Sequence, residues 1–321
     1  MTAQSSTTDS PTSTGLDWLL FGLLGFFWGS SYLFIKIGID AGLQPFTLVA
    51  LRLLIGLAVL AVVVAVAREP LPREPRMFGH LAVMGFFSVA LPFGLITWAE
   101  QSVDSSLAAV LTGAVPLFVI PIAAVLLPAE RITFNALLGI AVGLIGVAVV
   151  VGFDPSSLAS NELVAEIALI GAAASYALGG VYARRNVHGL RPMIPALFQV
   201  TFALLMVSIP ALVIERPWER PIAPEALFAV AWLGLFGSAL AFLVFFRLLR
   251  TWGATRTSVV AYVLPIWGIV LGALVLQEAI DARLLIGTAL VISGIALVNQ
   301  RRSLRTILAR DRTVRPSQER G

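Results

Sequence analysis

The chain has 321 residues, of which 58% are hydrophobic and 12% are charged, and its mean hydropathy is +0.93. Soluble domains carry about 25% charged residues, so this composition excludes an ordinary soluble domain and indicates a membrane protein with several spans. The formal net charge is +4. The chain contains no cysteine, and this absence excludes disulfides, thiol catalysis and cysteine-based metal sites.

The first residues, 1–15, are rich in Ser and Thr and contain no Lys or Arg. They lack the basic region of a signal peptide, and we expect a disordered cytoplasmic tail. Apolar runs of about 20 residues, long enough to cross about 30 Å of hydrocarbon, follow along the chain. The expected transmembrane helices are 16–39, 45–67, 77–98, 103–127, 135–152, 164–183, 193–214, 226–249, 257–276 and 283–300.

The two halves of the chain repeat each other. GFFSVALPFGL, which begins at Gly85, corresponds to GLFGSALAFLV, which begins at Gly234. The correspondence continues through the pairs Pro116 and Pro265, Glu130 and Glu278, Gly139 and Gly287, and Gly146 and Gly294. The repeat units are 16–152 and 163–299. Because each unit holds about five spans, an odd number, the two copies must enter the membrane in opposite directions, as in alternating-access transporters.

Prolines and glycines within the expected spans predict how these helices pack. A proline removes a backbone hydrogen bond and bends its helix, so we interpret Pro116 and Pro265 as two kinked helices beside a central cavity, with a role in packing alone as the alternative. Glycines at helical spacing allow close packing within the chain. Gly139 and Gly143 also form one GxxxG step, which leaves a homodimer open.

The distribution of charge predicts the orientation. If the N-terminus is cytoplasmic, most arginines of the loops lie inside, together with the basic tail 300–321, and acidic residues gather outside. The positive-inside rule then places both termini in the cytoplasm of a protein that crosses the plasma membrane several times. Nucleic-acid binding by the tail is the alternative, but behind a span we interpret the tail as a topology anchor at the lipid bilayer and expect no nucleic-acid partner.

The run Trp28-Gly29-Ser30-Ser31, followed by Lys36, Pro45 and Arg52, resembles the opening of EamA-type members of the drug/metabolite transporter superfamily. The repeated Pro, Glu and Gly residues of the two halves resemble the second hairpin of each EamA unit, and the resemblance covers almost the whole chain. It implies an all-α membrane protein with ten transmembrane helices as two inverted five-helix repeats, and a central cavity. It also implies secondary transport of small metabolites, frequently export of amino acids or related compounds.

Two cations within the expected spans are candidates for substrate binding. Lys36 is the only lysine of the chain, and a charge at the bilayer centre costs roughly 2.5 to 3.5 kcal/mol on insertion scales. It therefore faces a cavity or snorkels outward near Asp40. Arg52 lies about two turns inside its span. It forms either a pocket for a substrate carboxylate or an ion pair with Glu100 or Asp104.

Aromatic and amide side chains complete the candidate site, with anchoring of helices at the interface as their alternative role. The candidate substrate-binding residues are Trp28, Lys36, Arg52, Tyr176, Gln199, Tyr262 and Trp267. Because Arg52 corresponds to Gln199 in the second unit, the half that binds substrate stays open. His80 and His188 have no metal-site spacing, so we expect no metal, cofactor or catalytic residue. We expect structural roles for Glu130 and Glu278, with Thr133 and Asp281 as N-caps.

These observations favour a secondary transporter of small metabolites. An intramembrane enzyme and a non-transporting scaffold or receptor are the alternatives, and no grouped nucleophile, base or ligand set favours an enzyme. The chain has no phosphate-binding GxxxxGK[ST] loop. A proton antiporter usually presents an acid inside the membrane. The nearest candidate is Glu100 at the expected outer rim, so facilitated diffusion or exchange is the competing interpretation.

Overall fold

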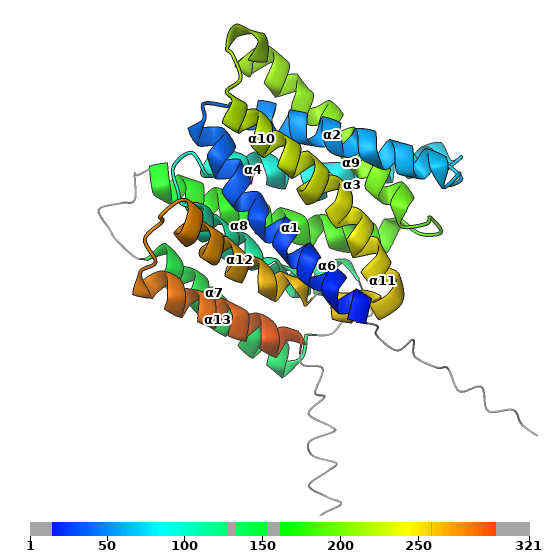
Figure 1. Cartoon of the computed structure of the whole chain (residues 1–321). Coiled ribbons are helices and arrows are strands. Elements are labelled where there is room, and N and C mark those ends of the chain that lie inside the picture. The colour runs from blue at the N-terminus through cyan, green and yellow to red at the C-terminus, as the bar shows by residue number, and fades with distance from the viewer. Residues whose placement is uncertain (1–14, 128–131, 153–160, 258, 300–321) are drawn as a thin grey trace, which may run out of the picture.

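The computed structural model describes residues 15–127, 132–152, 161–257 and 259–299 (Figure 1). Within these ranges every regular element is helical. Eight helical segments are long and apolar enough to cross a membrane: Gly15–Asp40, Pro45–Val66, Pro75–Ala99, Ser105–Leu126, Phe134–Val151, Asn161–Asn186, Met193–Glu215 and Pro224–Trp252. Two shorter apolar helices follow, Val260–Val275 and Ala282–Val298. Each expected span overlaps one of these segments, whereas Glu130 and both tails lie outside the described residues.

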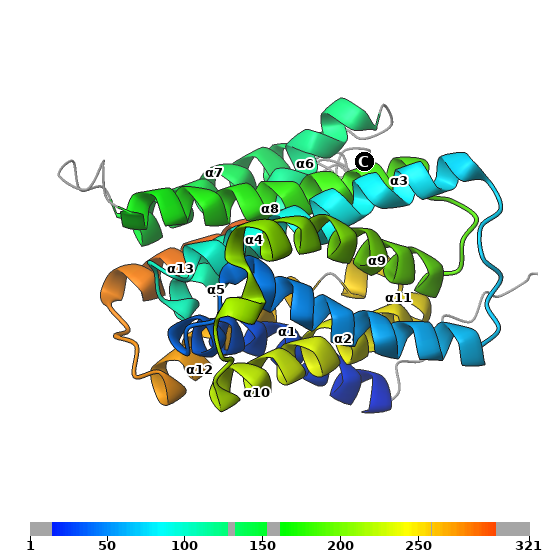
Figure 2. The same ribbon diagram turned by 90° about the horizontal axis from the view of Figure 1, so that it is seen from above.

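The individual helices are shorter than the spans because several spans are interrupted. The first half contains α1 (Gly15–Asp40), α2 (Pro45–Val66), α3 (Pro75–Gly85), α4 (Leu91–Ala99), α5 (Ser105–Gly113), α6 (Val115–Leu126) and α7 (Phe134–Val151). The second half contains α8 (Asn161–Asn186), α9 (Met193–Pro210), α10 (Pro224–Trp232), α11 (Ala241–Thr257), α12 (Val260–Val275) and α13 (Ala282–Asn299). Figure 2 shows α6, α7 and α8 along one side of the bundle and α1, α10 and α12 along the other.

The repeated motif adopts the same unusual backbone in both halves. Phe86–Ala90, between α3 and α4, and Leu233–Leu240, between α10 and α11, are π-helical. The first π segment packs against α8 and α9, and the second packs against α1 and α2. Each motif therefore contacts the first two helices of the other half. π-helical segments are rare in proteins, and those that occur are often found at functional sites.

Prolines mark only some of the interruptions. Pro116 lies in the first turn of α6, directly after α5 ends at Gly113, so this span is broken as expected. Pro265 instead lies inside α12, which is a single helix from Val260 to Val275, so the two prolines occupy different places in their helices. The two regions still touch, because a Cβ atom at Gly113 would lie 2.8 Å from Cγ of Pro265.

Helices α7 and α13 lie side by side at one edge of the bundle (Figure 1). Their glycines bring the two backbones into contact. A Cβ atom at Gly139 would lie 2.6 Å from the carbonyl oxygen of Gly294, and a Cβ atom at Gly146 would lie 2.8 Å from that of Gly287. These glycines therefore serve packing within the chain, which is how small residues join helices when lipid removes the hydrophobic drive for association.

Two carboxylates cap helices that are distant in sequence. Glu278 accepts hydrogen bonds from the backbone N–H groups of Ser105 (2.8 Å) and Ser106 (3.0 Å), at the start of α5. Glu215 accepts hydrogen bonds from the backbone N–H groups of Phe46 (2.9 Å) and Thr47 (2.6 Å), at the start of α2. The first N–H groups of a helix have no partner within the helix, and an acceptor with negative charge satisfies them.

The expected local caps are also present. Thr133 accepts a hydrogen bond from the backbone N–H of Ala136 (3.2 Å) and caps α7. Asp281 accepts one from Leu284 (2.7 Å) and caps α13. The backbone N–H of Leu284 lowers the pKa of the Asp281 carboxyl. The structural roles expected for Thr133, Glu278 and Asp281 are confirmed by these contacts.

The contact between α7 and α13 predicts the effect of one added methyl group. In Gly294→Ala the new Cβ would lie 2.5 Å from the backbone nitrogen of Gly143. The backbone of a packed helix cannot move aside as easily as a flexible side chain can. We expect a loss of about 1 to 3 kcal/mol in the free energy of unfolding and a lower melting temperature of the purified protein. Gly22→Ala, where no atom lies within 4 Å, is the control. Equal melting temperatures for both variants would contradict this packing.

Glu278→Ala tests the cap on α5. The substitution removes the acceptor of two backbone N–H groups and of Oγ of Ser105, so we expect a loss of about 1 to 3 kcal/mol in the free energy of unfolding. Glu219→Ala is the control, because Glu219 forms an exposed ion pair with Arg216, worth about 0 to 1 kcal/mol. The measurement is thermal unfolding in detergent. If Glu278→Ala and the control have the same melting temperature, the cap does not contribute to stability.

Candidate functional site

Arg52 is a buried cation within the span formed by α2, and its residue is 2% exposed. Its guanidinium carbon lies 4.2 Å from the ring centroid of Phe93. Its Nε atom donates a long hydrogen bond of 3.4 Å to Oγ of Ser238. Among the described residues no carboxylate oxygen lies within 4.0 Å of its nitrogen atoms. The expected alternative, an ion pair with Glu100 or Asp104, is therefore absent from this conformation.

Tyrosines surround this cation. The ring of Tyr176, from α8, meets the ring of Phe93 edge-on at 6.4 Å between centroids. Tyr32, from α1, is 7% exposed, and its hydroxyl lies 2.6 Å from Oγ1 of Thr112 and shares a hydrogen bond with it. Arg52 interacts electrostatically with Tyr176 and Tyr32. We call Tyr32, Arg52, Phe93, Tyr176 and Ser238 the Arg52 cluster; these residues come from α1, α2, α4, α8 and the second π segment.

Lys36 lies at the end of α4 rather than in the Arg52 cluster. Its Nζ atom donates a hydrogen bond to the backbone carbonyl of Glu100 (2.9 Å) and lies 3.5 Å from a carboxylate oxygen of Asp40. A cation at the C-terminal carbonyls of a helix offsets the helix dipole, so Lys36 fixes the end of α4. The side chain of Glu100 is fully buried, and neither carboxyl oxygen has a hydrogen-bond partner within the described residues.

Four of the candidate residues make contacts elsewhere in the bundle. The ring of Trp28 packs at 5.4 Å from Phe245 of α11, and the ring of Trp267 packs at 5.1 Å from Phe26. The hydroxyl of Tyr262 donates to the backbone carbonyl of Ile295 (3.0 Å) and joins α12 to α13. The backbone of Gln199 lies against Gly85. Of the seven candidates, the structure brings together Arg52 and Tyr176, which both approach Phe93.

Two residues of the cluster, Phe93 and Ser238, were not among the sequence candidates, although the sequence carries one signal for them. Phe93 belongs to the first copy of the repeated motif and Ser238 belongs to the second copy. Both contact Arg52. The recurrence of this motif, more than the composition of either copy, marks the segments that approach the buried cation.

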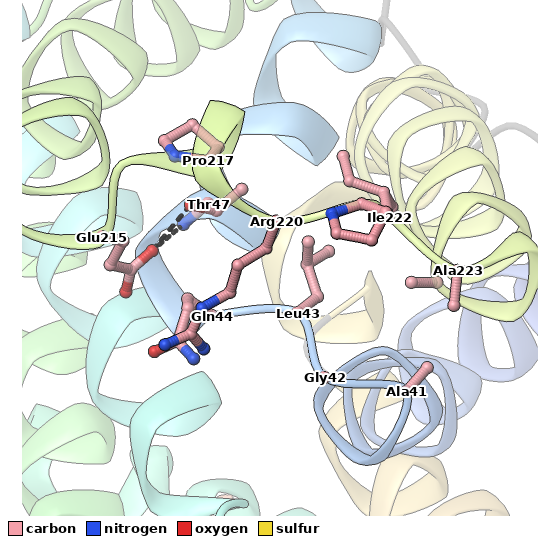
Figure 3. Close-up of a pocket in the computed structure, with 12 residues that line it drawn as sticks. Ala41, Gly42, Leu43, Gln44, Thr47, Glu215, Pro217, Arg220, Ile222 and Ala223 are labelled. Atoms are coloured by element: carbon pink, nitrogen blue, oxygen red, sulfur yellow. Dashed lines mark hydrogen bonds between the residues drawn. The ribbon is translucent and has the colours of Figure 1, made fainter.

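A second polar feature is a surface pocket between the end of α1, the start of α2 and the segment 215–223. Figure 3 shows Glu215 bonded to Thr47 and Arg220 directed toward Gln44. Oγ1 of Thr47 also donates to Glu215 (2.7 Å). The carboxylate of this pocket is thus already used by the protein to cap α2, and the Arg52 cluster is the better candidate for a ligand.

Comparison with known proteins agrees with this architecture. A sequence model of the EamA-like transporter family matches residues 16–152 and 163–300. The uncharacterized transporter YoaV of Bacillus subtilis is 23% identical over 276 residues, which are 84% of this chain and 91% of YoaV. A probable terminal-alkyne amino-acid exporter of Streptantibioticus cattleyicolor is 29% identical over 283 residues, 85% of this chain and 90% of the exporter.

A third relative and a solved structure extend the comparison. The uncharacterized inner membrane transporter YedA of Escherichia coli is 28% identical over 248 residues, 76% of this chain and 78% of YedA. One crystal structure shares the fold with a TM-score of 0.63 and 22% identity, and the match covers 93% of this chain and 99% of that one. Because the family model matches nearly all of both halves, the chain belongs to the EamA-like transporter family.

Proposed function

We propose that this protein is a secondary transporter that moves a small carboxylate-bearing metabolite, of the amino-acid class, by alternating access, with export as its direction. The observation that carries the proposal is the buried guanidinium of Arg52, which has no carboxylate partner among the described residues. Membership of a transporter family and the relative named as a probable amino-acid exporter support the same substrate class.

The chemistry of Arg52 favours an anionic ligand. A guanidinium has five N–H donors, and among the described residues its contacts are one long hydrogen bond, to Ser238, and the face of the Phe93 ring. Burial of an unpaired charge is costly, and a carboxylate that accepts two parallel hydrogen bonds from the guanidinium offsets this cost. The aromatic rings of Phe93 and Tyr176 provide an apolar wall for the rest of the ligand.

The proposed topology has ten spans in two inverted repeats, with both termini in the cytoplasm. Helix α1 begins and α13 ends at the same end of the bundle (Figure 1), as an even number of crossings requires. The loop between α2 and α3 and the loop between α8 and α9 contain arginines, including Arg73 and Arg191, and the positive-inside rule then assigns this end to the cytoplasm.

Substitution of Arg52 tests the binding role. In liposomes that contain the purified protein, exchange of a panel of the twenty standard amino acids should detect transport by the wild type. We expect Arg52→Gln to lower the transport rate roughly 10- to 100-fold, because one charge-assisted hydrogen bond contributes about 1.5 to 3 kcal/mol. Arg52→Lys should recover part of the rate, since an ammonium keeps the charge but loses the planar fork.

The melting temperature separates binding from folding in this experiment. Arg52→Gln should melt no lower than the wild type, because the substitution removes a buried charge that has no counter-ion. The control is Arg250→Gln, at an exposed position of α11, which should transport normally. A folded Arg52→Gln protein with normal transport would rule out the proposed role.

Reporter fusions test the topology. A periplasmic reporter, active only outside the cytoplasm, should be active when fused after Asp154 and inactive when fused after Arg302. The reason is that five spans precede the first position and ten precede the second in the inverted-repeat arrangement. A cytoplasmic reporter at the same two positions should give the opposite pattern. The same location for both positions would refute the inverted repeats.

A further inference from the structure

One face of α4 carries buried polar atoms that the protein leaves without partners. Phe93, Thr97 and Glu100 are spaced at i, i+4 and i+7, which places them on one side of the helix. Phe93 contacts Arg52, so this side faces the Arg52 cluster. Thr97 and Glu100 are each 0% exposed. Within the described chain, Oγ1 of Thr97 and both carboxyl oxygens of Glu100 have no hydrogen-bond partner, although buried polar groups nearly always have one.

Charged groups from several elements influence the pKa of the Glu100 carboxyl, but none of them forms an ion pair with it among the described residues. Lys36 and Asp40 belong to α1, Arg52 belongs to α2, and Glu278 follows α12. Lys36 is already bonded to the backbone carbonyl of Glu100 and paired with Asp40. Glu278 is already bonded to the start of α5. The remaining titratable groups nearby are Tyr32 on α1, Tyr176 on α8 and Asp104 before α5.

The surroundings of Glu100 favour its neutral form. Glu100 directly follows α4, and its burial raises the pKa of its carboxyl well above the usual range; Lys36 and Arg52 oppose this rise, and Glu278 and Asp40 add to it. A buried carboxyl without a hydrogen-bond partner or counter-ion takes up a proton rather than bear the cost of an unpaired charge. Glu100 follows the end of α4, close to Lys36 near the end of α1, and the bundle encloses its side chain there.

We infer that Glu100 is the second pole of the binding site, a carboxyl that holds a proton in the empty site and releases it when the ammonium group of an aminocarboxylate substrate binds. This inference rests on the proposed function. Arg52 contacts Phe93, which lies on the same side of α4 as Thr97 and Glu100, so the guanidinium and the carboxyl lie along one face of this helix without forming an ion pair within the described residues. A compound that carries both a carboxylate and an ammonium group satisfies both poles, and the hydroxyl of Thr97 lies between them along the helix.

The exchange balances in protons and charge. As the ammonium group approaches, the O–H bond of Glu100 breaks, its proton passes to water, and the carboxylate forms an ion pair with the ammonium. When the substrate leaves, a proton returns to Glu100. One substrate and about one proton would therefore occupy the site in turn, so a proton gradient could drive export of the substrate.

Infrared spectroscopy of the full-length protein tests the protonated state without any substrate. At pH 7 the wild type should show the C=O stretching band of a protonated carboxyl. Glu100→Gln should lose this band, and its fold should be preserved because an amide resembles the neutral acid. Asp104→Asn, at the same end of the bundle, should keep it. The inference is overturned if the wild type lacks the band or if Glu100→Gln retains it.

Proton release tests the exchange. An equimolar mixture of the twenty standard amino acids, added to the wild type with a pH-sensitive dye, should release up to about one proton per protein. The same mixture with acetylated amino groups, which lack the ammonium, should release none, and neither mixture should release protons from Glu100→Gln. Glu100→Asp, which keeps the acid, should recover part of the release. Equal release by both mixtures, or no release from the wild type, would refute the exchange.

Transport assays distinguish a failure of the proposed function from a failure of the inference about Glu100. If the wild type transports none of the twenty amino acids, the proposed function fails and this inference fails with it. If the wild type transports them and Glu100→Gln does so equally well at every pH from 5 to 9, the inference alone fails. The expected result is transport by the wild type that depends on pH, and transport by Glu100→Gln that is at least ten-fold slower and independent of pH.

Discussion

Lipid offers no hydrogen bonds, and the arrangement of polar groups in this protein follows from that constraint. The chain supplies partners from far along its sequence: Glu278 caps α5, Glu215 caps α2, and Lys36 caps the end of α4. Each contact joins segments that are more than 60 residues apart, so each fixes one helix relative to another. Against this background, two groups stand out among the described residues: Glu100, whose carboxyl oxygens have no hydrogen-bond partner, and Arg52, which has no carboxylate partner.

Features that depend on local periodicity were predictable from the sequence. The apolar segments, the close packing of glycine-bearing helices, and the caps at Thr133 and Asp281 follow from residue spacing alone, whereas the pairing of α7 with α13 does not. The direction in which a side chain points was not predictable, because helices that are apolar on all sides give no rotational signal. Tyr262 lies in the first turn of α12 and Trp267 lies further along the same helix, and they contact α13 and α1. Depth in the membrane does not determine which neighbour a residue meets.

The two halves share a backbone arrangement and differ in chemistry. Gly234 packs on the backbone of Arg52, and Gly85 packs in the same way on the backbone of Gln199. At the corresponding positions the first half has Arg52 and the second half has Gln199. The duplication thus supplies two equivalent positions beside the π segments, and only one of them carries a charge. The Arg52 cluster nevertheless draws on both halves, since Tyr32, Arg52 and Phe93 belong to the first half and Tyr176 and Ser238 belong to the second.

The caps made by Glu215 and Glu278 lie at the same end of the bundle, because α2 and α5 both begin there. Each joins a carboxylate of the second half to a helix of the first half. A movement that separated the halves at this end would expose four backbone N–H groups and two carboxylates together, and only water could replace the lost bonds. Opening of this end would therefore transfer these groups to water, and in the conformation described they instead hold the two halves together by hydrogen bonds.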